Sequence, residues 1–434
     1  MIALVASICG AFLVTLPGYR YRIDVVRCDA WPGILEYWPL WIGYLAGVAL
    51  LACAWLRLSD GERPGRWSLR ATLCLGALPH LVAATGPMFL SEDPLAYAAN
   101  GADAFFVPHH PFYQALQPAW RNVASVYSIG FDGLAHLVAL GGGQHLTRTL
   151  HLYQVLGAAC MITTGWLVGL TSGPRAAALV LFCPLAIIEG TLSAHNDGLL
   201  AISVALAVLL WSRDRRIWAM VALCSGLFIK ESAIILPSLW ALSWLIARIG
   251  WKRAVMVLVP VTIVLGLLVL THRISATTSA LLGGRELCIR AIECLPRATF
   301  YYLLDAPKAA LAVNLLFRSL AAAFLFYSAY RARTQNARLS STAAFLLYYY
   351  LFLHPYVQAW YLLSLLPFLP HLEPRLLKVA KTFLISLVSY YVVDIPFGCT
   401  PATHRLTWAL VQLTTSVIVV VPAVIVLLKQ RRPT

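Results

Sequence analysis

Charged side chains are scarce in this sequence of 434 residues: only 12% are Asp, Glu, Lys or Arg, whereas 60% are hydrophobic. The mean hydropathy is +0.76, far above what a soluble domain needs to fill its core. This composition excludes an ordinary soluble protein and predicts an all-α polytopic membrane protein.

Acidic residues are scarcer than basic ones, 18 against 33, so the formal net charge is +15. In a soluble protein this excess would suggest nucleic-acid binding. Here the basic residues gather between apolar runs, which is the pattern of cytoplasmic loops, and we expect no nucleic acid and both termini in the cytoplasm. The basic clusters lie at residues 57–70, 213–216, 248–253, 331–338, 375–381 and 429–432.

Flexible linkers, low-complexity tracts and internal repeats are lacking, so residues 1–434 are expected to form one domain. At about 15–25 residues per crossing, the apolar runs predict about 11–14 transmembrane helices. Residues 2–16 are expected to be a retained anchor helix, with a cleaved signal peptide as the alternative. Residues 91–148 and 272–308 are two long loops on the extracytoplasmic side, and the first should carry short interfacial helices, one of them near residues 131–140.

The ten cysteines show no zinc-site spacing. Cys288 and Cys294 lie in the second long loop, where a disulfide and two free thiols fit the sequence equally. No cofactor is expected. A divalent metal is not favoured, although Glu92, Asp93 and Asp197 could together bind one.

Glu92 and Asp93 directly follow the apolar run at residues 71–90, where a membrane helix should meet water. A carboxylate at such a rim, walled by aromatic rings, can act as a general base toward a hydroxyl. The alternative is that both acids cap an interfacial helix that begins at Pro94. The polar and aromatic residues of this constellation that could contact a ligand are Tyr97, His109, His110 and Tyr113.

Two further polar sites interrupt apolar sequence on the same predicted side. His195, Asn196 and Asp197 precede an apolar run, and their donors at a helix start suit an anionic or polyhydroxylated ligand, although Asp197 could simply cap that helix. Lys230, followed by Glu231, could bind a lipid phosphate or merely extend its ammonium toward water.

The last constellation is His354, Gln358, Trp360 and Tyr361, a polar break between apolar runs. Trp and Tyr there are typical of the aromatic belt at a membrane interface. Their faces could equally stack on a sugar ring.

In this order, the motifs resemble those of the GT-C glycosyltransferases, and most closely the bacterial polyprenyl-phosphate-mannose mannosyltransferases. The resemblance covers about residues 90–370. The matching residues are Ser91, Asp93, Tyr97, Gly101, Pro111, Tyr113, His195, Asn196, Asp197, Lys230, Pro237, Pro355, Trp360 and Tyr361.

The resemblance implies a GT-C-like helical bundle. It also implies an inverting transfer of a sugar, mannose above others, from a polyprenyl phosphate to a hydroxyl of a lipid or glycan acceptor on the extracytoplasmic face. Asp93 would be the base and Glu92 would orient the acceptor or tune the base. His195, Lys230 and Arg285 would bind the donor phosphate. The remaining sugar- and acceptor-binding residues would be Tyr97, His109, His110, Tyr113, Asn196, Asp197, His354, Gln358, Trp360 and Tyr361.

The expected partners are therefore the donor, the acceptor and membrane lipids, and the resemblance implies a bacterial inner membrane. The alternative function is a transporter or flippase for a lipid-linked saccharide. It would need charged residues deep within helices, and Arg318 and Asp394 are the few candidates.

Overall fold

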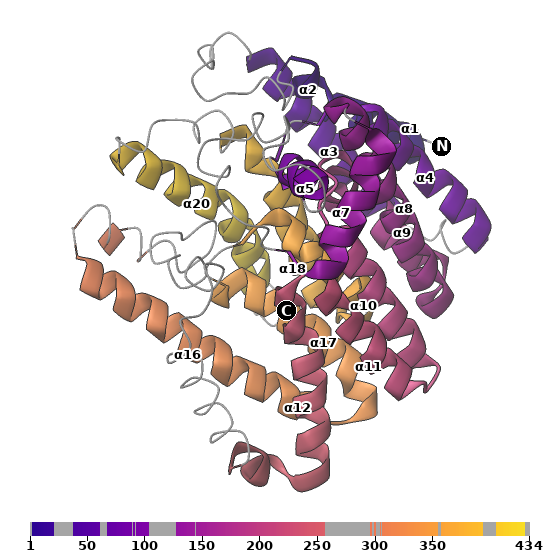
Figure 1. The fold of residues 1–434 in the computed structure, drawn as a ribbon. Helices are drawn as coiled ribbons and strands as arrows, with labels where there is room; N and C mark the ends of the chain where they lie inside the picture. The colour runs from indigo at the N-terminus through magenta and orange to yellow at the C-terminus, as the bar shows by residue number, and fades with distance from the viewer. Residues whose placement is uncertain are drawn as a thin grey trace.

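The protein is described by a computed structural model for residues 2–20, 38–60, 67–88, 90–91, 93–103, 127–143, 145–256, 296, 299–300, 304, 306–354, 357–393 and 405–429. These residues form helices joined by short turns, and no strand occurs among them (Figure 1). The all-α fold class is confirmed.

A first group of helices extends to residue 225. They are α1 (Ile2–Leu13), α2 (Leu16–Arg20), α3 (Trp38–Asp60), α4 (Leu69–Thr85), α5 (Asp93–Asp103), α7 (Ile129–Gly142), α8 (Leu146–Ser172), α9 (Pro174–Leu181), η4 (Ala186–Leu192), α10 (Asp197–Ser212) and α11 (Arg216–Ser225). The remaining helices are η5 (Gly226–Phe228), η6 (Glu231–Ile234), α12 (Ile235–Ile249), α16 (Pro307–Arg331), α17 (Gln335–Tyr348), η8 (Tyr349–Leu353), η9 (Ala359–His371), α18 (Pro374–Ser389) and α20 (Arg405–Lys429).

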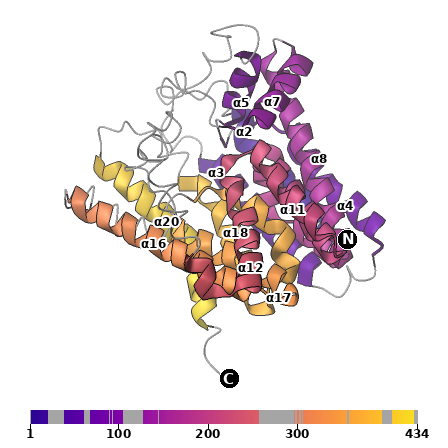
Figure 2. The ribbon, with the colours of Figure 1, turned by 60° about the horizontal axis from the view of Figure 1, so that its bottom comes forward.

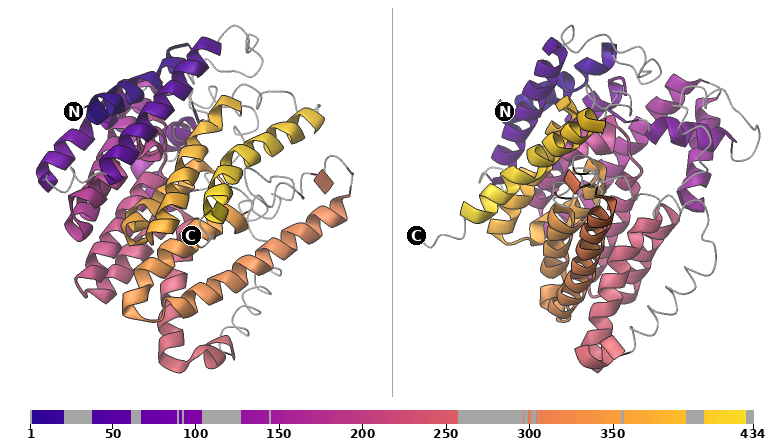
Figure 3. Two further views of the ribbon diagram at one scale, coloured as in Figure 1. Left: turned by 180° about the vertical axis from the view of Figure 1, so that it is seen from behind. Right: turned by 90° about the vertical axis from the view of Figure 1, so that its left-hand side faces the viewer.

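Seven helical segments of the described chain are long and apolar enough to cross a membrane, or eight if the bent pair α9 and η4 is one span. Four shorter apolar helices accompany them: Leu69–Thr85, Ile129–Gly142, Asp197–Ser212 and Arg216–Phe228. These segments fit an integral membrane protein, and the total of about 11–14 crossings stays a prediction. Figure 3 shows α16 and α20 as two long helices along one side of the bundle, and α16 exposes Leu315, Leu316 and Leu320, as a helix that faces lipid would.

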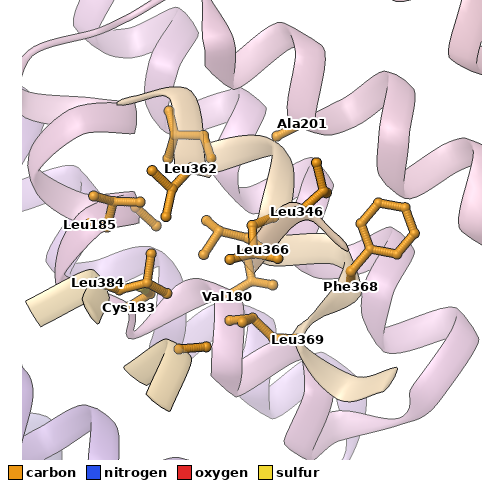
Figure 4. Packing of buried hydrophobic residues seen from close by; sticks show 14 of the residues in the cluster. Val180, Cys183, Leu185, Ala201, Leu346, Leu362, Leu366, Phe368, Leu369 and Leu384 are labelled. Atoms are coloured by element: carbon orange, nitrogen blue, oxygen red, sulfur yellow. The ribbon is translucent and has the colours of Figure 1, made fainter. Parts of the chain in front are cut away.

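The core centres on η9, which packs against α9, α10, α17 and α18. Figure 4 shows how Leu362 and Leu366 of η9 lie among Val180, Leu185 and Leu384 from these neighbours and from the turn after α9. Because η9 is apolar on nearly every side, it is stable only when other helices surround it.

The helix that leads to the site is broken. Between α9 and η4 the chain bends by 63° at residues 182–185, where Pro184 cannot donate a backbone hydrogen bond. At the other end of η4, Gln154 of α8 donates its Nε2 to the carbonyl oxygens of Gly86 (2.9 Å) and Leu192 (3.0 Å). Such internal partners are required for irregular backbone at membrane depth.

A glycine lets α8 approach this broken segment closely. A Cβ atom on Gly157 would lie 2.2 Å from the carbonyl oxygen of Gly190, so only glycine fits at this crossing. The position of η4, and of the turn that follows it, therefore depends on packing against α8.

Two short helices, α5 and α7, pack against each other at one end of the molecule (Figure 2). The helix expected near residues 131–140 is thus found as α7, which ends at Gly143 with a φ of +63°, and its interfacial position stays a prediction. Gly101 allows the contact with α7, because a Cβ there would lie 2.4 Å from the carbonyl oxygen of Ala135. This pair of helices holds the aromatic cluster that borders the candidate site.

Candidate active site

The turn from η4 to α10 carries three of the predicted residues in a buried position. Ala194 adopts a φ of +50°, which is unusual for a residue other than glycine and turns the chain sharply before His195. The backbone N–H of His195 donates to the carbonyl oxygen of Glu189 at 3.1 Å. Asp197 is the first residue of α10, where an acid offsets the positive end of the helix dipole.

The imidazole of His195 lies between two carboxylates. Its Nδ1 is 3.3 Å from Oδ2 of Asp93, and its Nε2 is 3.4 Å from Oε2 of Glu189. The side chains of His195 and Glu189 are fully buried, whereas that of Asp93 is 25% exposed. Asp93 is therefore the member of this triad that a ligand can reach.

Asp93 is the first residue of α5, and its backbone N–H donates to the hydroxyl oxygen of Ser91 at 3.2 Å. The carboxylate is thus placed at a helix start, as the capping alternative expected. Its contact with His195 goes beyond capping, because it joins α5 to the turn before α10.

Trp360 covers the imidazole from one face. The two rings are nearly parallel, at 10°, with their centroids 3.8 Å apart. Trp360 comes from the first turn of η9, so the core helix supplies one wall of the site. The belt interpretation of Trp360 stays a prediction, since a ring that stacks on a polar side chain can also lie at a membrane interface.

Lys230 forms the second charged pair. Its Nζ lies 2.9 Å from Oδ2 of Asp197 and 4.2 Å from the centroid of the Tyr361 ring. The Lys230 side chain is 14% exposed and that of Asp197 3% exposed, so the pair is largely withdrawn from water. The His354 ring packs edge-on at 5.7 Å from Tyr361, which extends this wall.

Tyr97 links α5 to the same turn. Its hydroxyl lies 3.4 Å from Oδ1 of Asn196 and donates to it, while the ring packs edge-on against Tyr127, Phe131 and Tyr153. Burial raises the pKa of Tyr97 well above its ordinary value, so the phenol is a neutral donor. The Nδ2 atom of Asn196 is buried and makes no hydrogen bond within the described residues, which leaves it as a donor for a ligand.

The structure thus brings together most of the predicted residues that it describes: Asp93, Tyr97, His195, Asn196, Asp197, Lys230, His354, Trp360 and Tyr361. Gln358 is buried at the start of η9. The predicted residues Glu92, His109, His110, Tyr113 and Arg285 lie outside the described residues, as do Cys288 and Cys294.

Glu189 is a site residue that the sequence analysis did not find. A signal was present: it is an acid within an apolar run, six residues before His195, and such residues in membrane segments tend to be functional. The carboxylates Asp93, Glu189 and Asp197 converge on one histidine and one lysine, but no group of three His, Cys, Asp or Glu side chains in the described chain is arranged to hold a metal ion.

Comparison with known proteins identifies the family. A sequence model described as the N-terminal domain of alpha-(1->6)-mannopyranosyltransferases matches residues 4–248, more than half of the chain. No curated protein and no solved structure matches. The matched segment contains Asp93, Glu189, His195 and Lys230, whereas Trp360 and Tyr361 lie beyond it. The chain therefore belongs to the alpha-(1->6)-mannopyranosyltransferase family, and its apolar helices make it a membrane mannosyltransferase.

Proposed function

We propose that the protein transfers a mannosyl residue from a polyprenyl phosphate to a hydroxyl of a lipid or glycan acceptor, with inversion at the anomeric carbon. The family name suggests the 6-hydroxyl of an acceptor mannose as the attacking group and an α-linked product. An inverting reaction with that product requires a β-configured donor. No observation supports the transporter alternative.

The observation that carries this proposal is the partly exposed carboxylate of Asp93, held through one oxygen by buried His195. As general base, Asp93 takes the proton of the acceptor hydroxyl while the acceptor oxygen forms a bond to C1 of the mannosyl group. The bond between C1 and the phosphate oxygen breaks, and polyprenyl phosphate leaves with the electron pair.

Lys230 is the described residue best suited to the leaving phosphate. An ammonium group has three N–H donors, and the contact with Asp197 occupies one of them. The other donors can meet a phosphate oxygen. Arg285 stays a prediction for the same role. We further propose that Asn196 and Tyr97 bind sugar hydroxyls, that Trp360 and Tyr361 border the sugar ring, and that a groove between helices holds the polyprenyl chain.

We also propose that the site faces the extracytoplasmic side of a bacterial inner membrane. The basic turn at Arg213 and Arg216 lies at the far end of α10 from Asp197. A helix of 16 residues separates these two ends by about 24 Å, most of the thickness of the hydrocarbon core. Since basic turns favour the cytoplasm, this arrangement supports a site on the opposite face. The cytoplasmic position of both termini stays a prediction.

The test is a transfer assay with purified protein in liposomes, β-linked polyprenyl-phosphate mannose and α-mannoside acceptors, with the product identified by mass spectrometry. Asp93→Asn should lower kcat by about 100-fold or more, because general base catalysis contributes at least that factor, and should leave donor binding nearly intact. Asp132→Asn, which changes another acid at the start of the neighbouring helix α7, is the matched control and should keep wild-type turnover. Wild-type turnover in Asp93→Asn would show that Asp93 is not the base.

A further inference from the structure

Glu189 is a carboxylate that has lost its hydration, which destabilises its charged form. Its side chain is fully buried in η4, within a bent apolar segment that is a candidate membrane span. An acid in such surroundings is costly unless it is paired, and its carboxylate lies 3.4 Å from Nε2 of His195. Glu189 does not reach the exposed side of the triad, so a role in the reaction would be exerted through His195.

We propose that Glu189 is a positioning residue: it holds the imidazole of His195 so that Nδ1 faces Asp93 and leaves one oxygen of Asp93 for the acceptor. This inference rests on the mannosyl transfer proposed above and adds a residue to it.

The hydrogen-bonding capacity of imidazole supports this role. A neutral imidazole has one N–H donor and one acceptor nitrogen, whereas the cation has two donors. Here a carboxylate oxygen lies 3.3 Å from Nδ1 of His195 and another lies 3.4 Å from Nε2, so each carboxylate is close enough to hold one side of the ring. Whichever ring nitrogen carries a proton, a carboxylate oxygen therefore lies within 3.4 Å of it.

The position of the ring is fixed from two further directions. Trp360 stacks on it with the ring centroids 3.8 Å apart, which restricts the tilt of the imidazole. The backbone N–H of His195 also donates to the carbonyl oxygen of Glu189, so main chain and side chain tie the two residues together. With Oδ2 of Asp93 held at 3.3 Å from His195, Oδ1 is the oxygen left for the acceptor hydroxyl.

Kinetics on the reconstituted full chain test the role. Glu189→Leu should lower kcat by about 10- to 100-fold, as loss of a residue that orients a functional histidine typically does, with the donor KM nearly unchanged. Glu189→Gln should lose less, because its amide oxygen can still accept from Nε2. When Glu189→Leu is added to His195→Asn, kcat should fall by less than about twofold below that of His195→Asn alone. The reason is that the effects of residues that act as a unit are not additive.

Thr191→Val is the matched control. Thr191 is a buried residue of the same short helix, and its hydroxyl pairs with Nδ1 of His80 at 2.7 Å, away from His195. This variant should unfold at a lower temperature and keep the wild-type kcat. A Glu189→Leu variant that loses stability like Thr191→Val but keeps kcat would overturn the proposal.

A second readout needs no substrate. Spectra of protein labelled with 15N-histidine, with the His195 signal assigned by its loss in His195→Phe, should show different chemical shifts for the His195 ring nitrogens in the wild type and in Glu189→Leu. An unchanged His195 signal in Glu189→Leu would also overturn the proposal. If the wild type forms no mannosylated product, the proposed function fails, and the spectra still decide whether Glu189 holds His195.

Discussion

Breaking the Lys230–Asp197 pair should destabilise the protein strongly, whereas removing both charges should not. Nζ of Lys230 lies 2.9 Å from Oδ2 of Asp197. The Lys230 side chain is 14% exposed and the Asp197 side chain 3% exposed, so water can solvate little of either charge. Removal of one partner from a buried ion pair costs about 3–5 kcal/mol, because the other charge stays buried without compensation. We expect this cost for Lys230→Met and for Asp197→Asn.

The double variant should recover most of the loss, since neutral side chains of similar volume leave no charge to solvate. The assay is denaturant or thermal unfolding of the purified protein in one detergent, evaluated as a double-mutant cycle. Tyr361→Phe is the control, because it keeps the ring under the ammonium at 4.2 Å. A coupling free energy below about 0.5 kcal/mol, which is the limit for independent sites, would refute the reasoning.

Two smaller predictions concern the packing around the site. Gly157→Ala should destabilise the protein by about 1–3 kcal/mol or more in unfolding experiments, because the new Cβ would meet the backbone oxygen of Gly190, whereas Gly133→Ala, which meets no atom within 4 Å, should be tolerated. Tyr97→Phe should cost about 1 kcal/mol of stability and also lower the transfer rate, because it removes the hydroxyl that holds Asn196. Tyr153→Phe is the control, because the hydroxyl of Tyr153 belongs to the same ring cluster but donates to the carbonyl oxygen of Ala135. Its transfer rate should match that of the wild type. Equal transfer rates in Tyr97→Phe and Tyr153→Phe would contradict the role of Tyr97.

Local sequence information was sufficient for several elements of the fold. The apolar composition predicted helices and a membrane, because only internally hydrogen-bonded segments are stable in lipid. The weakly amphipathic stretch with glycines at its end predicted the helix found as α7. The polar motifs stood out because each interrupts an apolar run, which is where membrane proteins place functional groups.

Other elements depended on contacts that periodicity does not encode. The bend between α9 and η4 contains Pro184, but the position of η4 beyond it depends on Gln154 and on the close approach at Gly157. Likewise, the sequence assigned Lys230 to the donor phosphate and Asp197 to a helix start, and only the fold showed that the two residues pair.

The sequence by itself determined the class of protein and the chemical types at the site: an acid at the start of α5, a His-Asn-Asp turn, a lysine and a Trp-Tyr pair. Tertiary structure alone decided how they combine, because these residues lie far apart in the chain and meet only through helix packing. Tertiary packing brings the carboxylates of Asp93 and Glu189 to the two sides of the His195 imidazole, and it stacks Trp360 of η9 on that ring. The physical reason is that hydrophobicity and helix signals act over a few turns of chain, whereas the pairing of buried charges depends on which helices lie side by side.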